Sequence, residues 1–235
     1  MLDEYQLIAI IAGIILILII VVLTSRTRII KTYEKYMHVN NKANLTGQQL
    51  AVFAKGVLGL TNLKLALTHN KLADAYSPKY KTLIISDEVC QTASLSSMAI
   101  VSHELGHATQ DKESTLLFCS CRLFNMITKI TNKFIIPLLV IGLFLYIFKY
   151  PNDSLGSILM VISGALFLIH FLNQILNIPL EYNASARALK FLKKYKLLSS
   201  SEYKKAKHLL GIAAQTYIAG LLDGLLILNK KKKWH

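Results

Sequence analysis

The chain has 235 residues, of which 53% are hydrophobic, and its mean hydropathy of +0.43 is too high for an average soluble protein. It carries 27 Lys and Arg residues against 13 Asp and Glu residues, and a net charge of +14 fits nucleic acid or anionic lipid as a partner. No nucleic-acid motif is present and the cations flank apolar blocks. The composition therefore favours a membrane protein in contact with anionic lipid. Three irregularly spaced cysteines, Cys90, Cys119 and Cys121, exclude a disulfide framework, and we expect free thiols.

The first apolar block, Leu7 to Leu23, contains no charged residue and, with its flanks, is long enough to cross a bilayer as a helix. A cleaved signal peptide begins with basic residues and ends with small ones, whereas this block follows two acidic residues and ends in TSRTR. We therefore predict an uncleaved anchor within residues 1–24. The cations directly after it place the N-terminus outside and the following segment in the cytoplasm.

A mixed polar region follows at residues 25–132, where the patterns predict helices and a small β element. Helical spacing begins after Thr46, a candidate N-cap. A turn around Pro78 precedes a short strand at residues 81–86, and the stretch TNLKLALTH fits either a strand or a helix end. Ser94 or Ser96 then caps another helix. The apolar face of that helix consists of Met98, Val101, Leu105 and Ala108.

Two further apolar blocks, residues 134–148 and 155–172, are separated by the turn-forming sequence KYPNDS. This pattern predicts a transmembrane helical hairpin at residues 133–177. Pro137, near the start of the first helix, is tolerable there. With the tip of the hairpin outside, Lys149 is the one Lys or Arg among the 27 on the outer side, which agrees with the positive-inside rule.

The last region, residues 178–235, begins with a basic amphipathic helical stretch that is broken by the serines at 199–201. An apolar stretch at residues 209–228 follows, and then a lysine tail. Internal glycines, Gln215 and Asp223 weaken this stretch as a membrane span, and the tail favours the cytoplasm. We expect an interfacial or buried helix here, with a further span as the alternative.

The segment SHELGHATQ in the second predicted helix carries the chemistry. His103 and His107 lie four residues apart, so one helical face presents both imidazoles to a single tetrahedral Zn²⁺. Glu104 can act as the general base that takes a proton from an attacking water. Zn²⁺ would lower the pKa of that water toward ~7 and polarise a carbonyl, so the pattern predicts amide hydrolysis. The alternative is a pair of solvated or core histidines.

A catalytic zinc needs a third protein ligand as well as an open position for water. No third histidine follows closely in GHATQDKESTLLF, which excludes the extended metzincin motif. Glu181 is attractive because we expect it to stand at the start of a helix, just after Pro179 and the returning arm of the hairpin. The small residues that follow would let this helix pack closely. The residues that remain open as third ligands are His69, His170, His208, Glu113, Glu181 and Glu202.

The stretches SMAIVSHELGHATQ, PLEYNASARAL and AAQTYIAGLLDGLLIL, separated by the apolar hairpin, together resemble the YugP-type neutral zinc metallopeptidases of bacterial membranes. More distantly, the layout is similar to the HtpX and CAAX prenyl protease families. The resemblance implies a mainly α membrane protein with a zincin-like cytoplasmic domain and a hairpin inserted between the two halves of the zinc site. It further implies that His103, His107 and Glu181 bind one Zn²⁺ and that Glu104 is the catalytic base.

Two positions after Glu181 depart from the pattern of related enzymes. Asn183 stands where the family usually has an aspartate, and Ser185 stands where related gluzincins have an aspartate that orients a ligand histidine. A carboxylate behind a ligand histidine raises its basicity. The departures therefore leave open which group performs that role.

Weaker roles concern substrate contacts. The strand at Thr82 to Ser86 could bind an extended peptide at a free sheet edge, or it could be an internal strand. Donors to the oxyanion of the transition state could come from four side chains. These are Tyr76, Tyr217, His69 and His208.

The leading interpretation is a multi-pass zinc metallopeptidase of the bacterial cell membrane, active at its cytoplasmic face on peptides or membrane proteins, with anionic lipids around it. One alternative is a catalytically silent membrane scaffold that keeps the fold, although such a protein would be free to lose Glu104. Another is a basic protein that binds nucleic acid or anionic lipid, which accounts for the lysines but not for the motif. We expect no nucleic-acid partner, and the sequence leaves the oligomeric state open.

Overall fold

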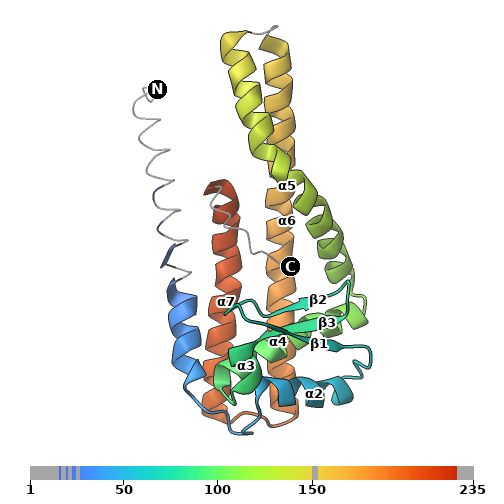
Figure 1. Cartoon of the computed structure of the whole chain (residues 1–235), viewed down its shortest axis with the longest axis vertical. Coiled ribbons are helices and arrows are strands. Elements are labelled where there is room, and N and C mark those ends of the chain that lie inside the picture. The colour runs from blue at the N-terminus through green and yellow to red at the C-terminus, as the bar shows by residue number, and fades with distance from the viewer. Residues whose placement is uncertain (1–15, 17–19, 21–22, 25–26, 150–152, 227–235) are drawn as a thin grey trace.

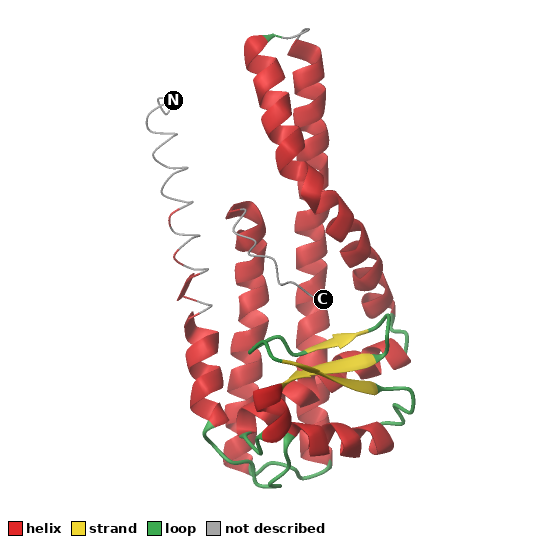
Figure 2. Cartoon of the chain, viewed as in Figure 1, coloured by secondary structure: helices red, strands yellow, loops and turns green. Residues whose placement is uncertain are grey.

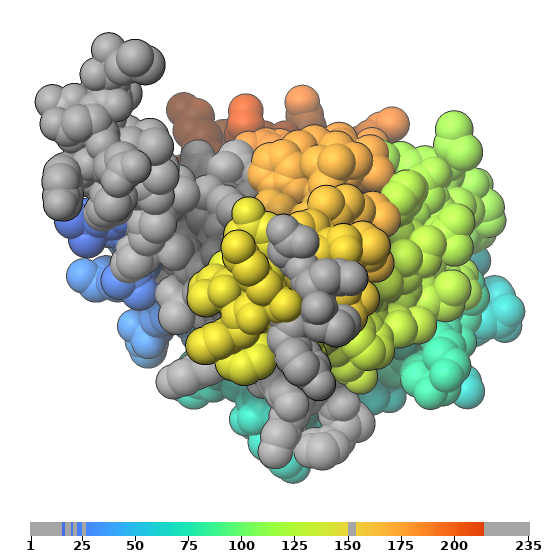
Figure 3. Space-filling view, turned by 90° about the horizontal axis from the view of Figure 1, so that it is seen from above, coloured from blue at the N-terminus to red at the C-terminus, as the bar shows by residue number. Residues whose placement is uncertain are grey.

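Two long helices, consecutive in the chain, extend furthest from the rest of the structure (Figure 1). They are α5 (Leu116–Phe148) and α6 (Asp153–Lys194), which pack against each other and lie side by side when viewed from above (Figure 3). The computed structural model describes residues 16, 20, 23–24, 27–149 and 153–226, with side chains through residue 213 except at residue 153. It is mainly helical, with one small sheet (Figure 2).

The remaining elements gather around the half of α6 that lies away from the hairpin turn (Figure 1). Residues 27–37 are helical and pack through Tyr36 on α7. In chain order the labelled elements are α2 (Gly47–Val57), β1 (Lys64–Thr68), β2 (Ala75–Ser77), β3 (Thr82–Ser86), α3 (Asp87–Gln91), α4 (Leu95–Lys112) and, after the hairpin, α7 (Ser200–Leu226).

The three strands form a mixed sheet in the order β1-β3-β2. β3 pairs in parallel with β1 and antiparallel with β2, so its backbone is hydrogen-bonded on both sides. The prediction of a strand after Pro78 is confirmed, and TNLKLALTH contains strand β1. The suggestion that Thr82–Ser86 offers a free edge to a peptide is wrong, because the edges of this sheet are β1 and β2.

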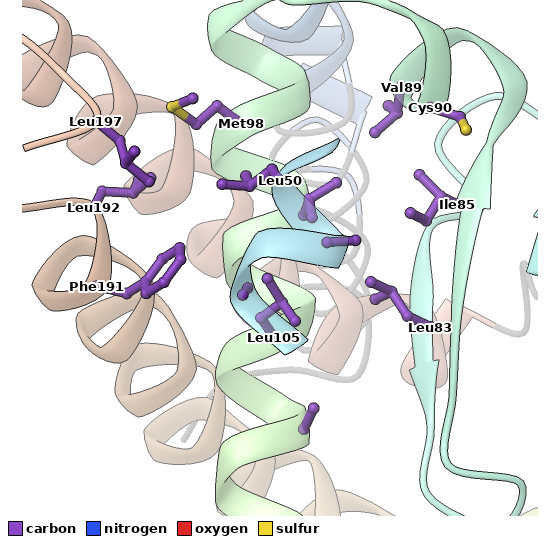
Figure 4. Packing of buried hydrophobic residues seen from close by; sticks show 14 of the residues in the cluster. Leu50, Leu83, Ile85, Val89, Cys90, Met98, Leu105, Phe191, Leu192 and Leu197 are labelled. Carbon is purple, nitrogen blue, oxygen red and sulfur yellow. The ribbon is translucent and has the colours of Figure 1, made fainter. Parts of the chain in front are cut away.

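Helix α4 lies at the centre of the lower body and contacts α2, β2, β3, α6 and α7. Its N-cap is Ser94, whose side chain accepts a hydrogen bond from the backbone N–H of Ser97. Thr46 caps α2 with a reciprocal capping box, as its position in the sequence predicts. The residues of the predicted apolar face of α4, such as Met98 and Leu105, are buried against α2, β3 and α6 (Figure 4).

The upper part of the hairpin exposes apolar side chains on all sides, for example Phe144, Ile147, Val161 and Leu168. Within the described residues, α5 and α6 are the two helices long and apolar enough to cross a membrane, and they contain 18-residue stretches with mean hydropathies of 2.0 and 2.2. An exposed apolar surface of this extent is characteristic of contact with lipid or with another protein. The helices approach closely at Gly142, where an added Cβ would lie 2.9 Å from the carbonyl oxygen of Gly156.

Both helices of the hairpin extend well beyond the apolar blocks. α5 begins at Leu116, so the short block 134–148 is only its last part. α6 continues from the hairpin turn to Lys194 without a break, although Pro179 lies inside it. The expectation that Glu181 starts a new helix after Pro179 is therefore wrong: packing on α4 and α7 holds the helix together across the hydrogen bond that proline removes.

Several expectations concern residues outside the described part. The proposed anchor at Leu7 to Leu23 lies almost entirely there, as does the lysine tail after residue 226. α7 is helical through Leu226, but its side chains beyond residue 213 are not described, which includes Tyr217. The expected divisions at residues 132/133 and 177/178 fall inside α5 and α6, so no change of secondary structure marks them.

Candidate metal centre

The two helices that carry the candidate residues, α4 and α6, touch backbone to backbone at Gly106. A Cβ added to Gly106 would lie 2.5 Å from the carbonyl oxygen of Ala184, a distance that no real side chain tolerates. Ala184 itself is fully buried. The glycine inside the HELGH segment therefore permits an approach that brings the side chains on either side of the contact within reach of each other.

His103 and His107 from α4 meet Glu181 from α6, which lies 78 residues after His103 in the chain. The Nε2 atom of His103 is 3.1 Å from one Glu181 oxygen, and the Nε2 atom of His107 is 3.5 Å from the same oxygen. One potential ligand atom from each residue lies within 4.8 Å of the other two. Two imidazole nitrogens and a carboxylate oxygen are a donor set that suits Zn²⁺, so the residues fit this metal.

His107 has its ring fixed by Gln110, one turn later in α4. The Gln110 amide nitrogen donates to the carbonyl oxygen of Leu180 at 3.0 Å and to Oδ1 of Asn183 at 2.9 Å. Both amide protons are thereby engaged, and the Gln110 oxygen faces Nδ1 of His107 at 2.9 Å. This oxygen can only accept, so Nδ1 of His107 carries a proton, and Nε2, which faces Glu181, is the ring nitrogen left to bind a metal.

His103 is oriented in a similar way by a residue of α6. Its Nδ1 atom lies 3.1 Å from the hydroxyl oxygen of Ser185. Ser185 stands at the position where related gluzincins have an aspartate that orients a ligand histidine. A neutral hydroxyl can accept a hydrogen bond from the Nδ1–H group and fix the ring, but it lacks the negative charge with which a carboxylate raises the basicity of the imidazole.

Glu104 lies half-buried beside the two histidines, and the backbone N–H of Tyr76 in β2 donates to its Oε2 atom at 2.8 Å. Burial raises the pKa of the Glu104 carboxyl and the nearby Glu181 adds to that effect, while His103, His107 and the Tyr76 N–H oppose it. A raised pKa makes this carboxylate a better proton acceptor than an exposed glutamate. Sequence patterns do not predict the contact between β2 and Glu104, because β2 is only three residues long and another strand, β3, separates it from α4 in the chain.

The charges of the histidine and glutamate side chains depend on each other. Burial lowers the pKa of His107, but the Glu181 carboxylate outweighs burial and raises this pKa to about 9. Burial also opposes ionisation of Glu181, yet its hydrogen bonds to the two histidines hold its pKa at about 2. At neutral pH and without metal, His107 therefore holds a proton that a metal cation must displace.

None of the other third-ligand candidates joins this cluster in the described part of the chain. His69 is exposed and pairs with Asp87, and His208 packs edge-on against Tyr36. Glu113 pairs with Arg187. The remaining two are His170, which lies in the apolar part of α6, and Glu202, which accepts from the backbone N–H of Ser199.

The structure describes the side chains of three of the four proposed oxyanion donors. The Tyr76 hydroxyl donates to Asp111 at 2.6 Å, and Lys81 binds the same carboxylate oxygen, so this hydroxyl already has a hydrogen-bond acceptor within the protein. His69 and His208 lie outside the cluster, as described above, and the side chain of Tyr217 is outside the described part. Gln110 is the orienting residue that sequence analysis missed, although its position three residues after His107 on the same helix was a usable signal.

Comparison with known proteins identifies the family of the chain. Residues 10–231 match the family model described as "Putative neutral zinc metallopeptidase", a stretch that includes both α4 and α6. The chain is also similar to the "Putative membrane protease YugP" of Bacillus subtilis (strain 168). The two are 28% identical over 194 residues, which is 82% of each chain. No solved structure matches the chain significantly.

The first prediction concerns the contact between α4 and α6. Gly106→Ala should lower the midpoint of thermal unfolding and weaken zinc binding by about 10–100-fold, because the new Cβ must push the two ligand-bearing helices apart. The control is Gly211→Ala in α7, where an added Cβ meets no atom within 4 Å. Zinc affinity equal in both variants would show that the contact does not position the ligands.

The second prediction concerns pH. Since the pKa of His107 in the metal-free protein is about 9, zinc binding near neutral pH must release its proton. The apparent Kd for zinc should therefore fall about tenfold per pH unit between pH 7 and 8, and level off above pH 9. Competition against a zinc chelator of known pH dependence measures this. An apparent Kd that stays constant over that range would contradict the assignment of His107.

Proposed function

The chain belongs to the neutral zinc metallopeptidase family, and from that premise we propose that it is a membrane-bound zinc endopeptidase. In this proposal His103, His107 and Glu181 hold one Zn²⁺ and Glu104 is the general base. The observation that carries it is the convergence of two imidazoles from α4 and one carboxylate from α6, with ligand atoms within 4.8 Å of one another and the Glu104 carboxylate beside them. When bound, the metal would supply Lewis acidity toward a peptide carbonyl and a water molecule.

The protein's own groups then have defined tasks. Glu104, held by the Tyr76 N–H, accepts the proton of the attacking water and passes it to the leaving amine. Gln110 and Ser185 keep the protons of the two histidines on Nδ1, which leaves both Nε2 atoms free to bind the metal. The raised pKa of Glu104 suits this exchange, because the group must both take and return a proton near neutral pH.

The edge strand β2 is the part of the sheet suited to a substrate peptide. Tyr76 directs its N–H toward Glu104 and not toward β3, so its carbonyl group lies on the same outer side of the strand. We place the extended backbone of the substrate along this edge, with the Tyr76 carbonyl as one acceptor for a substrate N–H. This assignment replaces the strand Thr82–Ser86, which is internal.

We infer the position of the site relative to the membrane from the apolar part of the hairpin. About 20 residues are needed to cross a bilayer as a helix. Counted from the hairpin turn, this places the aqueous boundary near Lys129 on α5 and Asn173 on α6. Glu181 is eight residues further along α6, roughly 12 Å at the rise of an α-helix. The site then lies just inside the cytoplasmic surface, where it can reach membrane proteins as well as soluble peptides.

The remaining expectations are part of the same proposal. Leu7 to Leu23 would anchor the N-terminus with an outside start, and the basic surface around the spans would contact anionic lipids of a bacterial cell membrane. The regions 25–132 and 178–235 would together form the zincin-like cytoplasmic part, and the hairpin would join its two halves. The relative of Bacillus subtilis is described as a membrane protease, which supports this placement.

The third prediction tests the base. Glu104→Gln should leave zinc content unchanged and reduce cleavage of fluorescently labelled casein by about 10²–10⁴-fold, because the amide cannot take the proton. Glu34→Gln, at an exposed position on the first described helix, should retain full activity. Retained cleavage in Glu104→Gln would contradict its role, and absence of cleavage in the unaltered protein with zinc bound would favour the silent scaffold.

The fourth prediction tests topology. A green fluorescent protein that folds only in the cytoplasm, fused after residue 115, should fluoresce in bacterial cells, whereas the same protein fused after residue 152 should not. The two fusion points lie at the start of α5 and in the hairpin turn. Fluorescence of the second fusion alone would place the metal centre on the outer face.

A further inference from the structure

A cavity lies on the face of α4 opposite the metal centre. It has a volume of about 600 Å³ and lies between α4, α6 and the end of α2. From α4 it is lined by Ser102, Leu105, Gly106, Thr109 and by Glu113, which follows the helix, whereas His103, Glu104 and His107 face the other side. Cavities of this size commonly hold small ligands.

Ser102 places an unsatisfied polar group in this cavity. Ser102 is 1% exposed, and its hydroxyl oxygen has no hydrogen-bond partner among the described residues. A buried hydroxyl without a partner costs about 1–3 kcal/mol. A ligand that brings an N–H group into the cavity would remove this cost.

The rim of the cavity is positively charged. Arg187, Lys190 and Lys194 line it together with one carboxylate, that of Glu113. Glu113 is already engaged, because Arg187 donates to it at 2.6 Å. Within the described part of the chain, neither Lys190 nor Lys194 has a carboxylate within ion-pair distance. The two ammonium groups therefore leave a net positive charge that suits one ligand anion.

The inner wall of the cavity is apolar. Leu58 at the end of α2, Leu105 on α4 and Phe191 on α6 contribute side chains to it. Figure 4 shows Leu105 and Phe191 on facing helices. An apolar body next to a single anionic group is therefore the chemistry that the cavity complements.

We propose that this cavity binds the apolar C-terminal residue of a peptide. The terminal carboxylate would pair with Lys190 and Lys194, the side chain would rest on Phe191 and Leu105, and the amide N–H would donate to the Ser102 hydroxyl. A fatty acid matches the charge and the apolar wall but has no N–H for Ser102, so the peptide end is the better fit. Because the cavity is separate from the metal ligands, peptide binding here does not require that the protein be a peptidase.

The site is also connected to the metal centre. Arg187 at the rim donates to Oδ1 of Asn183 at 2.8 Å, the same oxygen that accepts from Gln110, and Gln110 orients His107. A carboxylate bound near Arg187 would thus lie three hydrogen bonds away from a metal ligand. This network gives a route by which a bound peptide end could influence the site.

The test is a binding titration on the detergent-solubilised full chain, followed by ligand-observed NMR, with three probes. N-acetyl-leucine has the carboxylate and the amide, N-acetyl-leucinamide lacks the carboxylate, and decanoate lacks the amide. We expect saturable binding of N-acetyl-leucine and at least about tenfold weaker binding of the leucinamide. Equal binding of both, tighter binding of decanoate, or no binding of N-acetyl-leucine would overturn the proposal.

Variants locate the binding. Lys190→Gln with Lys194→Gln should weaken N-acetyl-leucine binding at least about tenfold. The control is Lys193→Gln with Lys196→Gln, near the end of α6 and in the turn after it, which line a different cavity and should leave binding unchanged. Ser102→Ala should also weaken binding while thermal stability stays equal or rises, because a buried unpartnered hydroxyl is removed. Binding unaffected by the Lys190 and Lys194 changes would assign it elsewhere, the metal centre included, and would contradict the proposal.

Discussion

The direct contact between the backbones of α4 and α6 at Gly106 and Ala184 is the constraint on which the metal centre depends. Two imidazoles on one helix fix only their own spacing, and the third group must come from a helix that approaches to the distance of a backbone contact. Only a residue without a side chain permits that distance at this position. Glycine at position 106 is therefore needed both for the close packing of the helices and for the assembly of the metal ligands.

Hydrogen bonds across the same interface convert proximity into orientation. Gln110 of α4 bonds to Leu180 and Asn183 of α6, and Ser185 of α6 bonds to His103 of α4. Each of these bonds satisfies a buried polar group and at the same time fixes a histidine ring. At the base of the hairpin, Asn125 of α5 bonds in the same manner to Asn173 and Asn177 of α6. The position of α6 is thus fixed both at the site and just above it.

Sequence reasoning reached the local parts of this arrangement. The HELGH spacing, the caps at Thr46 and Ser94, and the apolar blocks of the hairpin are patterns of neighbouring residues, and the structure contains the corresponding helices. It also favoured Glu181, which the structure does bring next to the two histidines. The position of one helix against another depends on contacts between distant segments, which periodicity does not encode. For this reason the continuity of α6 through Pro179, the internal place of β3 and the contact of Tyr76 with Glu104 emerged only from the structure.

Metal analysis of the purified chain tests the central claim most directly, that three side chains from two helices close on one zinc ion. The unaltered protein should carry about one zinc per chain, as the donor set of two imidazoles and one carboxylate predicts. Glu181→Ala should lose most of it, whereas Glu113→Ala, at another glutamate that contacts α6 through Arg187, should not. Unchanged zinc content in Glu181→Ala, with the protein still folded, would contradict this account of the metal centre.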